Sequence, residues 1–321
     1  MTKIITLEDL LSKTIDEMIY LYEQGYKIDE IIDLETPTTV AYVGDANPSW
    51  NTNGSSELLK DLNQIIKNSP TGNVNAVVFM GDMSYISLTK STISKSLIKD
   101  KPCFFVVGNH EVEYPDDMIS IKNHVFKLPV HYGPSGTART SYSFNVGYQY
   151  IMITNQYWDG LNDNICKWYK PYGGYSDNDG CYRYSRSDGG YIPYNLMKWI
   201  NEHLLSNIKW KIVAGHESMY PYKLYIGKSL DRDINNRDSL QSLFNKYGVN
   251  AFMCGHTHYA NVVKINNTYH VNTGAIGTGI DGTRDPGATI TYTTATSTTF
   301  KITQKIETSS WDEVITKEYI I

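Results

Sequence analysis

Val-Val-Phe-Met-Gly-Asp-Met-Ser-Tyr, residues 77–85, is an apolar run that passes directly into glycine, aspartate and tyrosine. Short runs of β-branched and aromatic residues bounded by glycine are typical of buried strands. The runs at 39–43 and 104–107 repeat this pattern and pass into Gly-Asp-Ala-Asn at 44–47 and Gly-Asn-His-Glu at 108–111. Because ligands of open α/β sheets bind beyond the carboxyl ends of the strands, we expect these polar side chains to meet at one rim and to carry the function.

Two further motifs, in the second half of the chain, have the same form. Val-Ala-Gly-His at 213–216 ends one apolar run, and Gly-His-Thr-His at 255–258 follows another. Ser55 or Ser56 is expected to cap a helix between the strands, and Gly248 is expected to end a later one. The alternation of strands and helices predicts an α/β fold. The apolar residues at helical spacing are Leu58, Leu59, Leu62, Ile65 and Ile66, then Leu196, Trp199, Ile200 and Leu204, then Leu240, Leu243, Phe244 and Tyr247.

Three segments depart from this alternation. Residues 1–36 are predicted to form an N-terminal helical extension, which would pack on the following domain or bind a partner. Residues 37–321 would form one domain, in which 157–190 is an insert too long for an ordinary connector and dense in Tyr, Gly, Asp and Asn. The Thr-rich stretch at 289–303 alternates like exposed strands.

The charge balance argues against one class of partner. A formal net charge of -5 comes without clustered Lys or Arg, which nonspecific binding of nucleic acid requires. No sustained apolar stretch occurs near the start, so we expect neither a signal peptide nor a membrane span, and a cytoplasmic protein. Cys103 and Cys254 lie in strand-like runs and are predicted to be buried free thiols. Cys166 and Cys181 would be either a reduced pair or a disulfide.

Six polar residues of the motifs form a candidate metal site. Taken singly, an aspartate after a strand is usually a helix cap, and a lone histidine is usually structural. Their order and their shared position at predicted strand ends argue against coincidence. The six are Asp45, Asp82, Asn109, His216, His256 and His258.

With these motifs the sequence resembles the calcineurin-like metallophosphoesterases over residues 38–292, and within them the purple acid phosphatases, particularly the small tartrate-resistant type. Tyr85 carries the narrower resemblance, because relatives outside the purple phosphatases usually lack this tyrosine and have His where this chain has Asn47. The purple phosphatases usually have Gly at that position. Asn47 would therefore either donate a hydrogen bond into the pocket or begin the turn that Pro48 completes, and it bears on substrate preference more than on metal binding.

The resemblance implies a binuclear metal centre in which Asp82 bridges the ions. Carboxylate and phenolate oxygens suit Fe(III) at the first position, whereas imidazole and amide ligands suit Fe(II), Zn or Mn at the second. The first ion would be held by Asp45, Asp82, Tyr85 and His258, and the second by Asp82, Asn109, His216 and His256.

The resemblance also implies the fold and the reaction. The fold would be a four-layer α/β/β/α sandwich of two mixed sheets flanked by helices. The reaction would be hydrolysis of phosphomonoesters by a metal-bound hydroxide at acidic or near-neutral pH, with a small phosphorylated compound or a phosphoprotein as substrate. His110 would contact the phosphate and protonate the leaving alkoxide, and Glu111 would orient the imidazole or support the ligands from behind.

Two alternatives stay open at this point. The same centre could cleave phosphodiesters or a nucleotide pyrophosphate bond, which differ in the room needed around the leaving group. A catalytically silent binding domain that docks through its N-terminal helix is the alternative outside enzymes, and the presence of all seven expected ligands argues against it.

Some residues near the motifs are weaker candidates. Residues 157–190 are expected to overhang the mouth of the site. The histidines without motif context, predicted to be structural, are His124, His131, His203 and His270. Candidate substrate contacts at the rim are Asn155, Glu217, Tyr220, Tyr222 and either Arg183 or Arg186.

Overall fold

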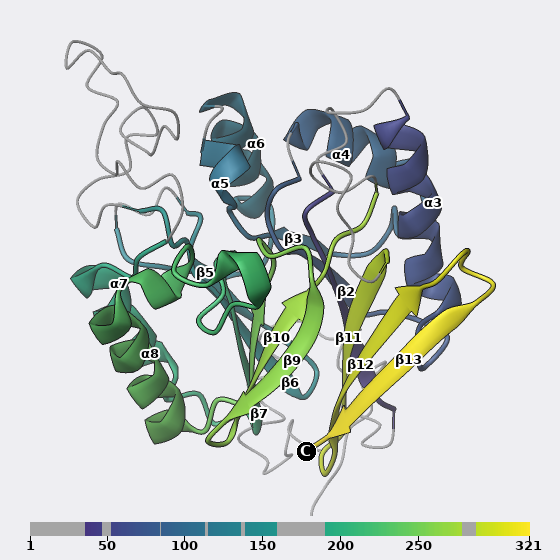
Figure 1. Cartoon of the computed structure of the whole chain (residues 1–321). Coiled ribbons are helices and arrows are strands. Elements are labelled where there is room, and N and C mark those ends of the chain that lie inside the picture. Colours follow the sequence, from purple (N-terminus) through teal and green to yellow (C-terminus); the bar gives the residue numbers. More distant parts are fainter. Residues whose placement is uncertain are drawn as a thin grey trace, which may run out of the picture. The chain divides into compact units, whose positions relative to one another are not determined.

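Two mixed β-sheets form the centre of the unit made by Thr38–Ile321 in the computed structural model (Figure 1). The structure describes residues 36–46, 53–83, 85–112, 115–135, 139–158, 190–277 and 287–321. The predicted N-terminal helix, Asn47, Cys166, Cys181 and both candidate arginines lie outside these ranges, as do residues 159–189 of the insert. Expectations about them stay predictions.

The first sheet has the strand order β13-β12-β11-β1-β2-β3. Its strands β1, β2 and β3 are parallel, and β11 joins β1 in antiparallel register. Their carboxyl ends therefore point to one edge, as the motifs predicted. The strands are β1 (Thr38–Val43), β2 (Ala76–Phe79), β3 (Cys103–Phe105), β11 (Thr289–Ala295), β12 (Phe300–Glu307) and β13 (Val314–Ile320).

The second sheet has the order β4-β5-β6-β7-β8-β10-β9, with β6, β7, β8 and β10 parallel. The strands β7 and β8 carry the two histidine motifs at their carboxyl ends. The strands are β4 (His131–Tyr132), β5 (Tyr142–Val146), β6 (Gln149–Ile153), β7 (Trp210–Ala214), β8 (Ala251–Cys254), β9 (Ala260–Ile265) and β10 (Thr268–Thr273).

Helices cover the two sheets on opposite sides, so that the order of layers is helix, sheet, sheet, helix (Figure 1). The first sheet has α3 (Gly54–Lys67), α4 (Ile86–Ile93), α5 (Asn109–Val112) and α6 (Pro115–Val125) beside it, and the second has α7 (Tyr194–His203) and α8 (Ile234–Tyr247). This is the predicted sandwich of two mixed sheets flanked by helices. Two short 3-10 turns, η4 (Lys223–Tyr225) and η5 (Leu230–Arg232), precede α8.

The helix ends follow local sequence only in part. Gly248 ends α8 with a φ of 65°, as predicted for a residue that must adopt the left-handed region. The expected cap of α3 was wrong, because Asn53 is the N-cap and Ser56 lies inside the helix, where its hydroxyl bonds the Asn53 carbonyl at 2.8 Å. Leu58, Leu62 and Ile65 of α3 are fully buried, so the apolar face fixes this helix on its sheet.

Buried polar bonds join the two sheets. Tyr142 of β5 donates its hydroxyl to the Phe105 carbonyl of β3 at 2.9 Å, and it accepts the Phe105 N–H at 3.0 Å. Thr293 of β11 donates to Gln149 of β6 at 2.5 Å. Such bonds satisfy polar groups that the sandwich removes from water, and they fix how the sheets face each other.

The expectation that 289–303 forms exposed strands was wrong. The first five residues of β11 are all buried, because β11 lies inside its sheet between β1 and β12. The hydroxyl of Thr289 bonds the Gly287 carbonyl, and that of Thr293 bonds Gln149 of the other sheet. Threonines that alternate with apolar residues can therefore be buried and do not mark a solvent face.

Among the described residues, no helix is both long enough and apolar enough to cross a membrane.

Candidate metal centre

The predicted donors lie at the carboxyl ends of strands from both sheets. Asp45 and Asp82 follow β1 and β2, Asn109 begins α5 just after β3, and His216 follows β7. His256 and His258 follow β8. All six side chains are buried, with at most 9% of any residue exposed. Strand geometry thus brings side chains from five separate places in the chain into one site.

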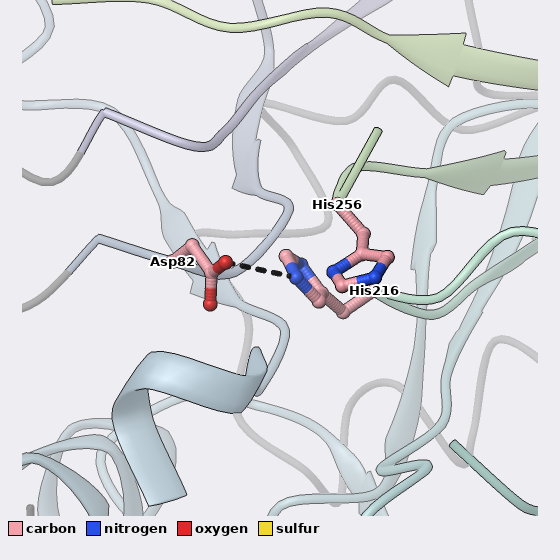
Figure 2. A group of neighbouring side chains, drawn as sticks. All are labelled: Asp82, His216 and His256. Carbon is pink, nitrogen blue, oxygen red and sulfur yellow. Dashed lines mark ion pairs between the residues drawn. The ribbon is translucent and has the colours of Figure 1, made fainter. Parts of the chain in front are cut away.

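Four donor atoms converge closely. His216 Nε2 lies 3.1 Å from Asp82 Oδ2 and 3.2 Å from Asn109 Oδ1. His256 Nδ1 also lies 3.2 Å from Asn109 Oδ1. Ligand atoms of Asp82, His216 and His256 all lie within 4.8 Å of one another, a spacing that one cation can bridge (Figure 2). These four residues are the set expected at the second metal position.

The set expected at the first position is brought together in part. His258 Nε2 lies 3.7 Å from Asp45 Oδ1, and the charge of Asp82 acts on both residues. Among the described residues, Asp45 Oδ2 is buried without a hydrogen-bond partner. Tyr85, the N-cap of α4, is 44% exposed and so differs from the six buried donors. Its ligand role stays a prediction.

Backbone strain concentrates at this site. Asp45, Asp82, His256 and His258 have φ values of 53°, 54°, 65° and 56°, in the left-handed region that residues other than glycine seldom adopt. Each such residue costs on the order of 1 to 3 kcal/mol unless its surroundings hold it, and strain of this kind gathers at functional sites. The fold therefore holds these four side chains in positions that local preference would not give.

Glycine is required where the donors approach the backbone most closely. A Cβ on Gly108 would overlap Asp82 Oδ1 and come within 2.8 Å of Glu111 Oε2. A Cβ on Gly255 would lie 2.6 Å from Asp45 Oδ2. The glycines of these motifs leave room for carboxylates.

The donors perturb one another's pKa. Burial raises the pKa of Asp45 well above its ordinary value, and the charge of Asp82 adds to this while His216 opposes it. Burial acts the same way on Asp82, but His216 and His110 outweigh it and lower the pKa of Asp82. Burial opposes protonation of His216, yet Asp82 raises its pKa to about 10. Crowded carboxylates and imidazoles of this kind are stabilised by cations, and a mixed oxygen and nitrogen donor set suits iron, zinc or manganese.

Glu111 holds the backbone of the site in place. It is fully buried, and its carboxylate accepts N–H bonds from Asp82 at 2.8 Å, Met83 at 2.6 Å and Gly108 at 2.7 Å. Burial, with the charge of Asp82, raises the pKa of Glu111 to about 7. Glu111 thus ties the turn after β2 to the turn after β3. This corresponds to support of the ligands from behind, one of its two expected roles.

His110 lies beside the donors. Its ring Nε2 is 4.0 Å from Asp82 Oδ2, and its backbone N–H bonds Asp82 Oδ1 at 2.9 Å. The residue is 7% exposed. His110 is thus placed beside the carboxylate of Asp82, and its expected contact with phosphate stays a prediction.

The weaker rim candidates differ from expectation. Asn155 and Glu217 are fully buried, so their expected role as rim contacts was wrong. Asn155 donates to Thr140 Oγ1 at 2.7 Å, and Glu217 turns inward toward the site. Tyr220 packs edge-on against His270 with ring centroids 4.6 Å apart, whereas Tyr222 is 45% exposed and stays a candidate contact.

Three functional candidates belong to none of the predicted motifs. Gln156 and Tyr157 contact Glu217 directly. Tyr225 of η4 lies against both histidines of one motif, with its ring centroid 5.2 Å from His256 and 5.9 Å from His258. These contacts join residues that are far apart in sequence, so that no local pattern could reveal them.

The described cysteines and two of the histidines without motif context have structural surroundings. Cys103 and Cys254 are buried free thiols, as predicted. His124 Nε2 bonds the Cys103 carbonyl at 2.6 Å, and His203 Nδ1 bonds the Trp199 carbonyl at 3.0 Å.

Comparison with known proteins gives one family match. A family model described as calcineurin-like phosphoesterase matches residues 38–260. No curated protein sequence matches the chain significantly. Among solved structures, GAP50, described as the anchor in the inner membrane complex of Plasmodium, is similar with a TM-score of 0.51 and 16% identity, covering 89% of this chain and 88% of that chain. This similarity supports the fold.

Two other solved structures are more distant. Vacuolar protein sorting 29 from Cryptosporidium parvum has a TM-score of 0.41 and 10% identity, covering 89% of this chain and 99% of that chain. A putative 5'-nucleotidase from Staphylococcus aureus has a TM-score of 0.44 and 16% identity, covering 81% of this chain and 51% of that chain.

Proposed function

The chain belongs to the calcineurin-like phosphoesterase family, and from this premise we propose that it is a binuclear metal-dependent phosphomonoesterase of the purple acid phosphatase type. The observation that carries the proposal is the convergence of Asp82, Asn109, His216 and His256, with His216 Nε2 and His256 Nδ1 each 3.2 Å from the same amide oxygen. Asp45 and His258, 3.7 Å apart and both within the electrostatic influence of Asp82, add to this donor set.

The residues present fit a pair of cations. Asp82, Asn109, His216 and His256 would hold one, and Asp45, Asp82, Tyr85 and His258 the other. Bound cations would neutralise phosphate charge and lower the pKa of a water, so that a nucleophile exists near neutral or acidic pH. The protein's part is to hold these donors in place, which the left-handed backbone of Asp82 and the three N–H bonds to Glu111 accomplish.

His110 supplies the proton in this proposal. Its Nε2 lies 4.0 Å from Oδ2 of Asp82, the carboxylate that would bridge the two ions, so that a phosphate bound to those ions would lie within reach of the ring. An imidazole in that position would donate a proton to the leaving oxygen, a role worth typically about 10²- to 10⁴-fold in rate. A small phosphorylated compound or a phosphoprotein would be the substrate.

Metal analysis combined with a hydrolysis assay tests the proposal. The wild-type protein should contain two metal ions per chain and release nitrophenol from nitrophenyl phosphate between pH 4 and pH 8. We expect His110→Ala to keep both ions but to lose about 10²- to 10⁴-fold in kcat. Faster release from bis(nitrophenyl) phosphate would favour a phosphodiesterase instead. A protein that holds two ions and hydrolyses neither ester would favour a silent binding domain.

The iron assignment depends on Tyr85. A phenolate bound to Fe(III) absorbs visible light by charge transfer, so iron-loaded wild-type protein should be violet or pink. Tyr85→Phe should lose the colour while its iron content stays measurable. A colourless iron-loaded wild type, or a colour that survives in Tyr85→Phe, would contradict the assignment.

A further inference from the structure

Glu217 is a buried carboxylate on the far side of a metal-ligand histidine. It follows His216 directly in sequence. Its Oε2 nevertheless lies 3.4 Å from Nε2 of His256, a residue from a different motif. Glu217 is 0% exposed, so it neither meets solvent nor lines the rim. A buried carboxylate of this kind needs partners that compensate for its charge.

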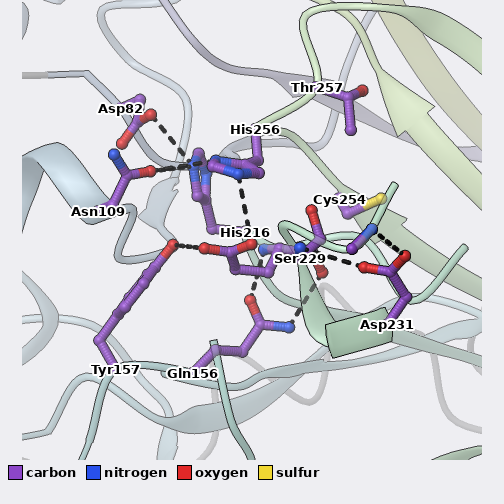
Figure 3. A network of polar contacts seen from close by, with 12 residues as sticks. Asp82, Asn109, Gln156, Tyr157, His216, Ser229, Asp231, Cys254, His256 and Thr257 are labelled. Carbon is purple, nitrogen blue, oxygen red and sulfur yellow. Dashed lines mark hydrogen bonds and ion pairs between the residues drawn. The ribbon is translucent and has the colours of Figure 1, made fainter. Parts of the chain in front are cut away.

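Gln156 and Tyr157 hold Glu217 in one position. Gln156 bonds the Glu217 backbone twice, by accepting its N–H at 2.5 Å and by donating to its carbonyl at 3.2 Å. Tyr157 donates its hydroxyl to Glu217 Oε1 at 2.5 Å, a bond marked in Figure 3 by the dashed line at the Tyr157 hydroxyl. Because Oε1 is engaged by Tyr157, the other oxygen is directed at His256.

Gly190 adds a steric constraint from a distant part of the chain. A Cβ on Gly190 would lie 2.9 Å from the Glu217 side chain and 2.8 Å from that of Gln156. The Tyr191 N–H also bonds the Gln156 carbonyl at 2.8 Å. The carboxylate is thus enclosed by side chain and backbone and has little freedom to turn away.

The two nitrogens of His256 face different groups. Nδ1 lies 3.2 Å from Asn109 Oδ1, within the donor cluster, and Nε2 faces Glu217. The carboxylate is therefore on the opposite side of the ring from the cluster, which argues against Glu217 as a ligand itself. A metal-ligating histidine is commonly oriented by an acceptor on its other ring nitrogen, which also makes the ligating nitrogen more basic.

His216 provides an internal comparison. Its Nδ1 bonds the Met80 carbonyl at 2.7 Å, and its Nε2 faces Asp82 and Asn109. The partner behind His216 is thus a neutral carbonyl, whereas the partner behind His256 is a carboxylate. Of the two, the carboxylate is the stronger acceptor.

We propose that Glu217, held by Tyr157 and Gln156, is a positioning residue that fixes the ring of His256 with Nδ1 toward the metal and so sets the affinity of the second metal position. The inference rests on the proposed metal-dependent function. It assigns Glu217 a role that no strand-end motif predicts. Glu217 acts through His256 in this proposal, because it is fully buried and its Oε2 lies opposite Nε2 of that ring.

Metal titration of purified protein tests this role. Affinities for Zn²⁺ at both positions would be measured by competition with a chromophoric chelator, in wild type, Glu217→Ala, Glu217→Gln and Tyr157→Phe. Glu217→Ala should weaken one position by about 10- to 100-fold and leave the other within about 3-fold. Glu217→Gln should lose less, because its amide oxygen can take the place of Oε2 opposite Nε2 of His256, and Tyr157→Phe should lose least.

A second measurement separates positioning from a general loss of stability. The zinc-loaded wild type should show a downfield proton resonance for the hydrogen-bonded His256 ring N–H, and Glu217→Ala should lack it. Gln149→Ala is the matched control, because Gln149 is fully buried and bonds Thr293 but has no contact with the site in the described structure. This control should lower the unfolding temperature and keep both zinc affinities.

The outcomes distinguish the two proposals. Wild type that binds no zinc would overturn the metal-dependent function and, with it, the role of Glu217. Wild type that binds two ions, together with Glu217→Ala and Glu217→Gln that bind them equally well, would overturn only the role of Glu217. If Gln149→Ala and Glu217→Ala both lost zinc binding at both metal positions, the role of Glu217 would also be overturned. A general loss of stability would then explain the change. If Glu217→Ala does not fold, Glu217→Gln and Tyr157→Phe decide.

Discussion

At the scale of single residues, Glu111 shows how hydrogen bonds to the backbone hold the site together. Its carboxylate accepts three backbone N–H bonds, at 2.6 to 2.8 Å, from two different strand-end turns. A carboxylate has acceptor sites for three donors, whereas an amide presents one oxygen and a competing NH₂ group. The role of Glu111 is therefore defined by its charge and shape more than by its place in the motif.

Glu111→Gln should destabilise the metal-free protein by about 2 to 3 kcal/mol, because at least one buried N–H would lose its acceptor. Urea unfolding measures this. Asp117→Asn is the matched control, since Asp117 is also buried but, within the described part of the chain, accepts only the Ile86 N–H, at 2.7 Å. Asp117→Asn should cost less than about 1 kcal/mol, because its amide oxygen can still accept this single N–H. Equal losses of unfolding free energy in the two variants would contradict the role of Glu111 in tying the turns after β2 and β3 together.

At the scale of elements, the strand ends were predictable and the surroundings of each donor were not. Apolar runs that end in glycine and a polar residue gave β1, β2, β3, β7 and β8 with the donors Asp45, Asp82, Asn109, His216 and His256 at their ends. This worked because strand period and glycine turns are local properties. The burial of β11 and the inward turn of Glu217 depend on neighbours distant in sequence. No local pattern of hydrophobicity contains that information.

The turn after β3 gives a test at this scale. Gly108→Ala would place a methyl group against Asp82 and within 2.8 Å of Glu111 Oε2. We expect a loss of about 1 to 3 kcal/mol in unfolding free energy, together with weaker metal binding, because both carboxylates must move. Isothermal titration with Zn²⁺ and urea unfolding would measure the two effects.

Gly72→Ala is the matched glycine control for this test. Gly72, unlike Gly108, has a positive φ, of 74°, and no described atom lies within 4 Å of its added Cβ. The backbone strain should cost about 1 to 2 kcal/mol and leave zinc affinity unchanged. Weaker zinc binding in Gly72→Ala, or normal binding in Gly108→Ala, would count against the steric explanation.

For the whole molecule, buried polar groups decide how stability depends on pH. Some of those between the sheets are paired, as in the bonds of Tyr142 with Phe105 and of Thr293 with Gln149. His270 of β10 is different. It is fully buried among Tyr220, Phe244 and Phe252, and neither ring nitrogen has a hydrogen-bond partner among the described residues. Burial lowers its pKa to about 3, so the folded protein keeps this imidazole neutral.

The unfolded chain should protonate His270 near pH 6.5, whereas the folded protein does so only near its pKa of about 3. Stability is therefore fully present above pH 6.5 and falls as the pH drops below it, by about 2 kcal/mol at pH 5 from this residue alone. His270→Phe cannot titrate, so its unfolding free energy relative to wild type should improve by about that amount between pH 7 and pH 5. Urea unfolding at pH 5, 6 and 7 measures the difference. His270→Leu should fit the core differently and show another offset at pH 7, but it should share the same slope with pH. A slope that remains equal to that of wild type in both variants would mean that His270 is protonated in the folded protein as readily as in the unfolded chain.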